Sequence, residues 1–172
     1  NCQTAVVAIA KAASMIDNLD IQVSYRTTTG DKPIILIAYD SRVDSFKKIT
    51  SLFKHICASN LTPEGLTFEA IKNELVAASG DRESYFINFS DGMPYCEPKG
   101  YQYYGESAVQ HTRKQVDGMR KKGIKVLSYF IGQNQYGSHD EFTRMYGKSA
   151  QSIDVTSLLP LAKTLNKMFL TK

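Results

Sequence analysis

Residues 85–92 have the sequence YFINFSDG, an apolar run that ends in a hydroxyl, a carboxylate and a glycine. The run Tyr85–Phe89 has the length of a strand, and a second run of the same kind spans Ile34–Tyr39. Continuous apolar runs of this length are typical of strands that are covered on both faces of a sheet. The stretch therefore predicts a buried strand that leads into a polar loop at its carboxyl end.

Helical and strand patterns alternate along the rest of the chain. Apolar residues at three- and four-residue intervals predict helices near residues 6–16, 46–56, 68–75, 109–119 and 158–169. The remaining apolar runs predict strands near 21–26, 34–39, 85–89, 124–131 and 152–155. This alternation is typical of an α/β domain with an open, mostly parallel sheet and helices on both faces. No internal repeat or linker divides the 172 residues, so we expect one domain over 1–172.

The composition excludes several classes of protein. Hydrophobic residues make up 42% and charged residues 22%, as in ordinary globular domains. No apolar run approaches the roughly 18–20 residues of a membrane helix, so we expect a soluble protein without membrane contact. The net charge is only +4 and basic residues gather only at 113–122, which argues against nucleic acid as a partner. Three cysteines without short spacing favour a reducing, cytoplasmic compartment over a disulfide framework.

The candidate chemistry lies in the loops that follow the predicted strands, where sheets of this class bind their ligands. Ser90, Asp91 and Gly92 offer a hydroxyl, a carboxylate and a tight turn, and Thr62 offers a second hydroxyl at the predicted start of a helix. Oxygen ligands of this kind suit a hard cation such as Mg²⁺. Taken separately, Thr62 is more typical of a helix cap, and residues 90–92 are more typical of a plain turn.

Taken together and in this order, the motifs resemble the metal-ion-dependent adhesion site (MIDAS) of the von Willebrand factor A family. The sequence LTPEG at 61–65 is similar to the family's threonine loop, and FSDGMP at 89–94 is similar to its aspartate turn. Intracellular bacterial and phage members, such as the von Willebrand A-type subunit of cobalt chelatase, look most similar. The resemblance implies a Rossmann-like sheet and a metal held by Thr62 and Asp91, with Ser90 and Gly92 supporting. The implied ion is Mg²⁺, with Mn²⁺ or Ca²⁺ as alternatives.

One part of the family pattern is absent from these residues. No Asp-x-Ser-x-Ser motif is present, and the nearest string, residues 40–45, has the wrong spacing and follows the wrong strand. In the family this motif follows the first, central strand, which would precede Asn1. We therefore expect an N-terminally incomplete domain, whose first strand comes from an upstream segment or from a second chain. The strands near 21–26 and 84–89 should then flank the slot of that strand without pairing.

The resemblance implies a binding module rather than an enzyme. A protein partner would add an aspartate or glutamate to the metal, and the expected partner is a AAA+ ATPase of the MoxR or chelatase type. We expect this partner to contact Glu64 and four tyrosines of the loop beside the metal: Tyr95, Tyr101, Tyr103 and Tyr104. Two alternatives stay open. One is a non-catalytic subunit of a metal chelatase, and the other is a phosphate- or nucleotide-binding α/β enzyme with a coincidental Ser-Asp-Gly turn.

Overall fold

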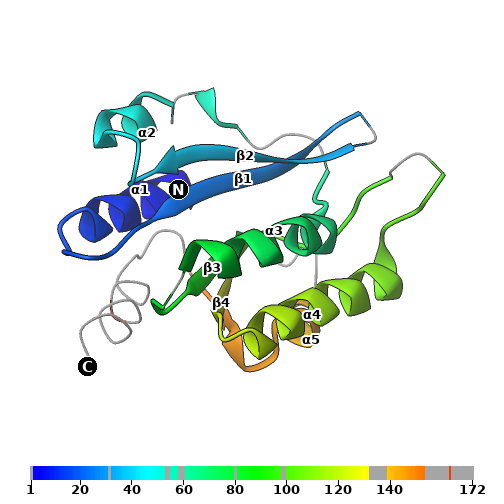
Figure 1. The fold of residues 1–172 in the computed structure, drawn as a ribbon. Coiled ribbons are helices and arrows are strands. Elements are labelled where there is room, and N and C mark those ends of the chain that lie inside the picture. The colour runs from blue at the N-terminus through cyan, green and yellow to red at the C-terminus, as the bar shows by residue number, and fades with distance from the viewer. Residues whose placement is uncertain are drawn as a thin grey trace.

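The computed structural model describes residues 2–30, 32–52, 55–57, 61–79, 81–97, 100–131, 139–153 and 163. The elements are, in chain order, α1 (Cys2–Ala13), β1 (Gln22–Thr29), β2 (Lys32–Asp40), α2 (Phe46–Leu52), α3 (Glu64–Ser79), β3 (Tyr85–Ser90), α4 (Gly105–Lys121), β4 (Lys125–Phe130), α5 (His139–Tyr146), a 3-10 turn (Gly147–Ser149) and β5 (Ala150–Ser152) (Figure 1). The predicted α/β class is confirmed. The predicted helix at 158–169 lies outside the described residues, apart from residue 163. None of the described helices combines the length and apolar character that crossing a membrane requires.

The described strands form two sheets. β1 and β2 make an antiparallel pair with a register shift between Val23 and Ser24. β3, β4 and β5 make a parallel sheet in that order, with β4 in the middle. No ladder bonds join β1 to β3 among the described strands, so the expected lack of pairing between the segments at 21–26 and 84–89 is confirmed.

Helices cover both faces of the parallel sheet. Phe86 of β3 points toward α3, where its ring lies edge-on to Phe68 with the centroids 5.0 Å apart. The next residue, Ile87, points to the other face and packs in a cluster that includes Ala5 of α1 and Tyr129 of β4. Successive strand residues point to opposite faces. Burial on both sides therefore explains why the run at 85–89 is apolar at every position except Asn88.

Helix α1 contacts both sheets. Ala5 packs in the cluster with Tyr129 of the parallel sheet, whereas Ala10 packs in a cluster with Val23 of β1 and Tyr39 of β2. These side chains are all less than a tenth exposed. On this face, α1 therefore supplies the apolar contacts that hold the hairpin and the parallel sheet together.

Candidate functional site

The two sequence motifs of the candidate site lie side by side in the structure. The Thr62 amide donates to the carbonyl of Tyr95 at 2.8 Å, and the Tyr95 amide donates to the carbonyl of Thr62 at 2.9 Å. This antiparallel bridge joins the loop that precedes α3 to the loop that follows β3. Residues about thirty positions apart in the sequence are thereby held together at the carboxyl end of β3, as parallel α/β sheets favour for binding sites.

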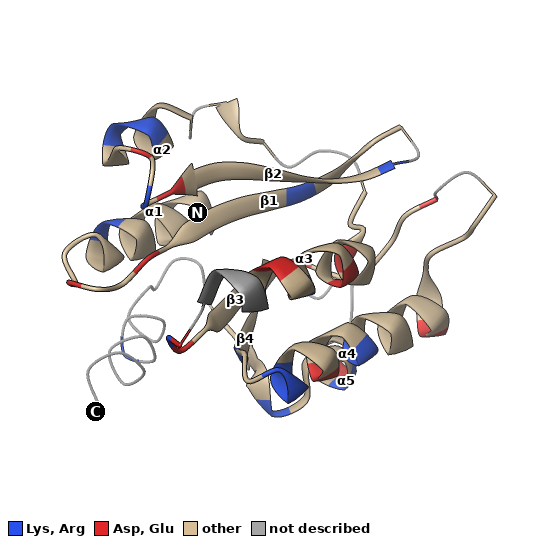
Figure 2. Cartoon of the chain, in the orientation of Figure 1, with Lys and Arg blue, Asp and Glu red and all other residues tan. Residues whose placement is uncertain are grey.

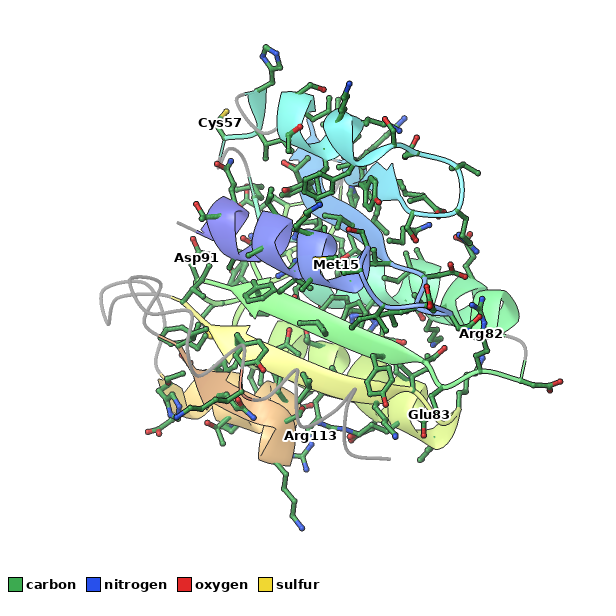
Figure 3. The ribbon with its side chains drawn as sticks, turned by 90° about the vertical axis from the view of Figure 1, so that its left-hand side faces the viewer. Met15, Cys57, Arg82, Glu83, Asp91 and Arg113 are labelled. Atoms are coloured by element: carbon green, nitrogen blue, oxygen red, sulfur yellow. The ribbon has the colours of Figure 1, made fainter. Side chains whose placement is uncertain are left out.

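Asp91 is the first residue after β3, and its side chain is exposed. Figure 3 shows Asp91 at the edge of the sheet, next to the beginning of α1. The preceding residue, Ser90, is buried, and its hydroxyl donates to the carbonyl of Gly92 at 3.3 Å. Ser90 thus closes the turn that presents the Asp91 carboxylate to solvent.

These donors match part of a metal site. Asp91 supplies a carboxylate, and Thr62 and Ser90 supply hydroxyl oxygens, which are ligands that hard divalent cations accept while keeping several waters. Within the described residues, no group of three or more His, Cys, Asp or Glu side chains is placed to hold a metal ion. One carboxylate is a small ligand set, so a cation here would take further ligands from water, from a partner or from residues beyond those described.

Glu64 follows Thr62 by two residues, but its side chain is fully buried. Its Oε1 atom lies 2.8 Å from Nη2 of Arg26 in β1 and accepts from the Asn88 amide of β3 at 3.1 Å. The expectation that Glu64 contacts a partner is therefore corrected. A carboxylate that is enclosed and engaged in this way belongs to the core.

Arg26 connects the hairpin to the parallel sheet, and the sequence analysis did not identify it. Its guanidinium donates to Asn88 Oδ1 at 2.7 Å, to Glu64 at 2.8 Å and to the main-chain carbonyl of Phe89 at 3.2 Å. These bonds join β1 to β3 through a side chain, in a place where no ladder bonds join them. The one signal in the sequence is Asn88, a polar residue that interrupts the apolar run at 85–89.

Tyr103 is also buried, so the expectation that it contacts a partner is corrected. Its hydroxyl lies 3.0 Å from His111 Nδ1 and 3.2 Å from Thr112 Oγ1, both on α4. A Cβ atom placed on Gly65 would come within 2.3 Å of the same hydroxyl. The Tyr103 ring therefore anchors the loop that follows β3 against α3 and α4.

Tyr95, Tyr101 and Tyr104 remain exposed, at 42%, 52% and 44% of their surface. We call these three residues the tyrosine rim. The rings of Tyr95 and Tyr104 stack with centroids 6.0 Å apart, and the backbone of Tyr95 is the one that pairs with Thr62. Exposed aromatic rings are typical of recognition surfaces. Contact between the tyrosine rim and a partner stays a prediction.

The buried Tyr103 hydroxyl predicts a loss of stability at alkaline pH. Burial raises the pKa of Tyr103 from 10.0 to about 12. The folded protein therefore keeps this phenol neutral at pH values where the unfolded chain ionises it. The stability that the neutral phenol contributes is complete below pH 10 and is lost as the pH rises toward 12, by an amount on the order of 2–3 kcal/mol.

Urea unfolding between about pH 9 and pH 12 measures this loss. The Tyr103→Phe variant should lose less stability over that interval than the unmodified chain. Some decrease of the free energy of unfolding with pH should remain in the variant, because burial also raises the pKa of Tyr146. Tyr104→Phe, at an exposed ring, is the matched control. If the free energy of unfolding fell equally with pH in the unmodified chain and in Tyr103→Phe, the prediction would be wrong.

No protein-family model and no curated protein matches the chain. Among solved structures, the chain is similar to proximal thread matrix protein 1 from the mussel byssus, whose structure has a zinc-occupied MIDAS motif. The TM-score is 0.60 at 14% sequence identity, and the match covers 95% of this chain and 40% of the mussel protein. The chain thus spans less than half of that protein. At this identity the similarity shows the fold alone, which is that of a von Willebrand A-like α/β domain.

Proposed function

We propose that the chain is a divalent-metal-dependent protein-binding module whose contact surface centres on Thr62 and Asp91. The observation that carries the proposal is the backbone bridge between Thr62 and Tyr95, which places the threonine loop beside the turn that presents Asp91. The exposed Asp91 carboxylate and the similarity to a fold that carries a zinc-occupied MIDAS support it.

The Asp91 carboxylate and the Thr62 hydroxyl would hold the cation, either directly or through water. A bound divalent ion would supply the positive charge that attracts an aspartate or glutamate of the partner. Ser90 would act indirectly, because its hydroxyl closes the turn at Gly92. Mg²⁺, Mn²⁺, Ca²⁺ and Zn²⁺ are the ions to compare.

The remaining protein ligands would come from a strand that pairs with β1 and β3, provided by an upstream segment or by a second polypeptide. β1 pairs with β2 and β3 pairs with β4, while the Arg26 side chain reaches from β1 to a main-chain carbonyl of β3. Figure 3 shows α1 beginning at the same end of the sheet as Asp91. A strand that leads into α1 would therefore bring its final loop to the candidate site.

The proposed partner is a AAA+ ATPase of the MoxR or chelatase type, in the cytoplasm. This part rests on the resemblance of LTPEG and FSDGMP to bacterial and phage domains. A non-catalytic role in a metal chelatase is a variant of the same proposal, since the domain would still act by binding an ATPase. Turnover that needs chelatase partners would favour this variant.

Replacing Asp91 with Ala should lower the affinity for the cation roughly 100-fold or more, because even indirect supports of a metal are worth 10–100-fold. Isothermal titration with each of the four ions measures this loss. The melting temperature should barely change, since substitutions at exposed sites are usually within about 0.5 kcal/mol. Asp117→Ala, which removes a carboxylate from α4, is the matched control.

Partner binding is tested by capture on the immobilised protein with and without a chelator. Recovery of an ATPase that is lost on chelation and lost with Asp91→Ala would support the proposal. Tyr104→Ala should weaken capture and leave the metal affinity unchanged, because the ring belongs to the tyrosine rim and not to the metal ligands. Normal metal binding by Asp91→Ala, or capture that persists in the chelator, would refute it.

A further inference from the structure

An open groove of about 470 Å³ runs along α4 where this helix lies beside α3. The residues that form its charge and shape are Lys72 of α3 and Arg113, Lys114, Asp117, Gly118 and Lys121 of α4. We call this feature the α4 groove. It shares no residue with the candidate metal site, and α4 packs on the face of the sheet opposite α1.

The α4 groove has an excess of positive charge. Its single carboxylate, Asp117, is already engaged by Arg120 at 3.0 Å and by Arg113 at 3.8 Å. The Lys72 ammonium donates to the Gln115 side chain, a neutral partner, at 2.6 Å. Figure 2 shows how the basic residues gather on α4 toward the end that leads into β4.

Two cations of the groove, Lys114 and Lys121, form no ion pair within the described part of the chain. Both are exposed, and Arg113 beside them is 64% exposed. Their charges are therefore available to an external anion, and a cluster of like charges raises the local concentration of such an anion.

Gly118 lies between these cations on the groove floor, and nothing in the fold requires a glycine there. A Cβ atom at this position would meet no atom within 4 Å, and the residue does not adopt a positive φ. Glycine inside a helix costs about 0.5–1 kcal/mol relative to alanine. Its one structural effect is to leave the helix backbone accessible in the middle of a row of positive charges.

We propose that the α4 groove binds an extended acidic segment of a partner protein, with Gly118 at the point of closest approach. Lys121 follows Arg113 by eight positions, a rise of about 12 Å along the helix. An extended peptide of about four residues spans the same length. The carboxylates of the peptide would pair with Lys114 and Lys121. The Asp117 carboxylate would accept hydrogen bonds from the backbone amides of the peptide.

A peptide fits the groove better than a nucleic acid does. Asp117 lies within the row of cations, where a continuous phosphate backbone would place a negative charge against it. Proteins that bind duplexes commonly neutralise about 6–10 phosphates, more than the four cations of this groove can contact. A polypeptide can instead alternate carboxylates with neutral positions.

The test uses a fluorescein-labelled peptide of alternating Glu and Ser residues, titrated with the protein and followed by fluorescence anisotropy. The double variant Lys114→Glu/Lys121→Glu should bind the peptide roughly 10-fold more weakly or worse. Lys32→Glu/Lys47→Glu makes the same change in net charge at exposed positions of β2 and α2 and should change the affinity less than about 2-fold. Binding should also weaken as salt rises to about 200 mM.

Gly118 provides an uncharged test of the same groove. Gly118→Gln should reduce the affinity for the peptide roughly 10-fold by filling the floor, whereas Gly118→Ala should stay within about 3-fold. Asp91→Ala should bind the peptide normally, so failure here is distinguishable from failure of the proposed metal-dependent function. Equal losses for the two lysine double variants, normal binding by Gly118→Gln, or tighter binding of a single-stranded oligonucleotide of equal charge would each overturn the proposal.

Discussion

Replacing Glu64 with Leu should lower the free energy of unfolding by about 3–5 kcal/mol, a large share of the stability of a single domain. The Glu64 side chain is fully buried, and the Arg26 side chain is only 20% exposed. Removing the carboxylate leaves the guanidinium charge without its counterion and removes one of the two acceptors of the Asn88 side-chain amide, the other being the Tyr146 hydroxyl. Urea unfolding followed by circular dichroism measures the loss, and the melting temperature should fall by roughly 6–20 °C.

The matched control is Glu69→Leu on the same helix, because the Glu69 side chain is 55% exposed and should cost no more than about 0.5 kcal/mol. The double variant Arg26→Met/Glu64→Leu should be more stable than Glu64→Leu alone. Within the described residues, Arg26 Nε and Glu64 Oε2 are buried without hydrogen-bond partners, so the pair does not fully offset its own desolvation. Equal stability of Glu64→Leu and Glu69→Leu would show that the network does not stabilise the fold.

Replacing Gly65 with Ala should destabilise the protein by about 1–3 kcal/mol, although the same change inside a helix is usually stabilising. The new Cβ atom would lie 2.3 Å from the Tyr103 hydroxyl, 2.8 Å from Thr112 Oγ1 and 2.9 Å from Thr112 Cα. The side-chain atoms can shift, but the backbone of α4 cannot do so without moving the helix. The close approach of α3 and α4 therefore depends on a glycine at this position.

Gly118→Ala is the control for the Gly65 prediction, because it makes the same chemical change with no atom within 4 Å of the new Cβ. It should raise stability by about 0.5–1 kcal/mol. Adding Tyr103→Phe to Gly65→Ala should recover part of the loss, since this removes the nearest atom and leaves the backbone contact in place. If Gly65→Ala and Gly118→Ala change stability in the same direction, the packing argument is wrong.

The sequence was most informative where a feature depends on neighbouring residues. The apolar run at 85–89 predicted a strand buried on both faces, and the alternation of helical and strand patterns predicted the α/β class. The order of the threonine loop and the aspartate turn led us to expect Thr62 and Asp91 at one site. The bridge between Thr62 and Tyr95 brings the two loops together at the carboxyl end of β3.

The roles of Glu64 and Tyr103 could not be predicted in this way. A glutamate in the first turn of a helix and a tyrosine in a polar loop are both usually exposed. Glu64 is buried because the guanidinium of Arg26, 38 residues earlier on β1, reaches its carboxylate at the beginning of α3. Tyr103 is buried because Gly65 leaves room for its hydroxyl between α3 and α4.

Helix periodicity, strand length and turn chemistry are properties of a few consecutive residues, so the alternation of elements and the two site loops follow from the sequence alone. Which polar side chains the fold encloses depends instead on contacts between segments that are distant in the chain. Burying a charged group is favourable only when a counterion reaches it. Arg26 meets Glu64 only after the hairpin has docked beside the parallel sheet, and so the tertiary structure alone decided which residues of the site loops belong to the core and which are exposed.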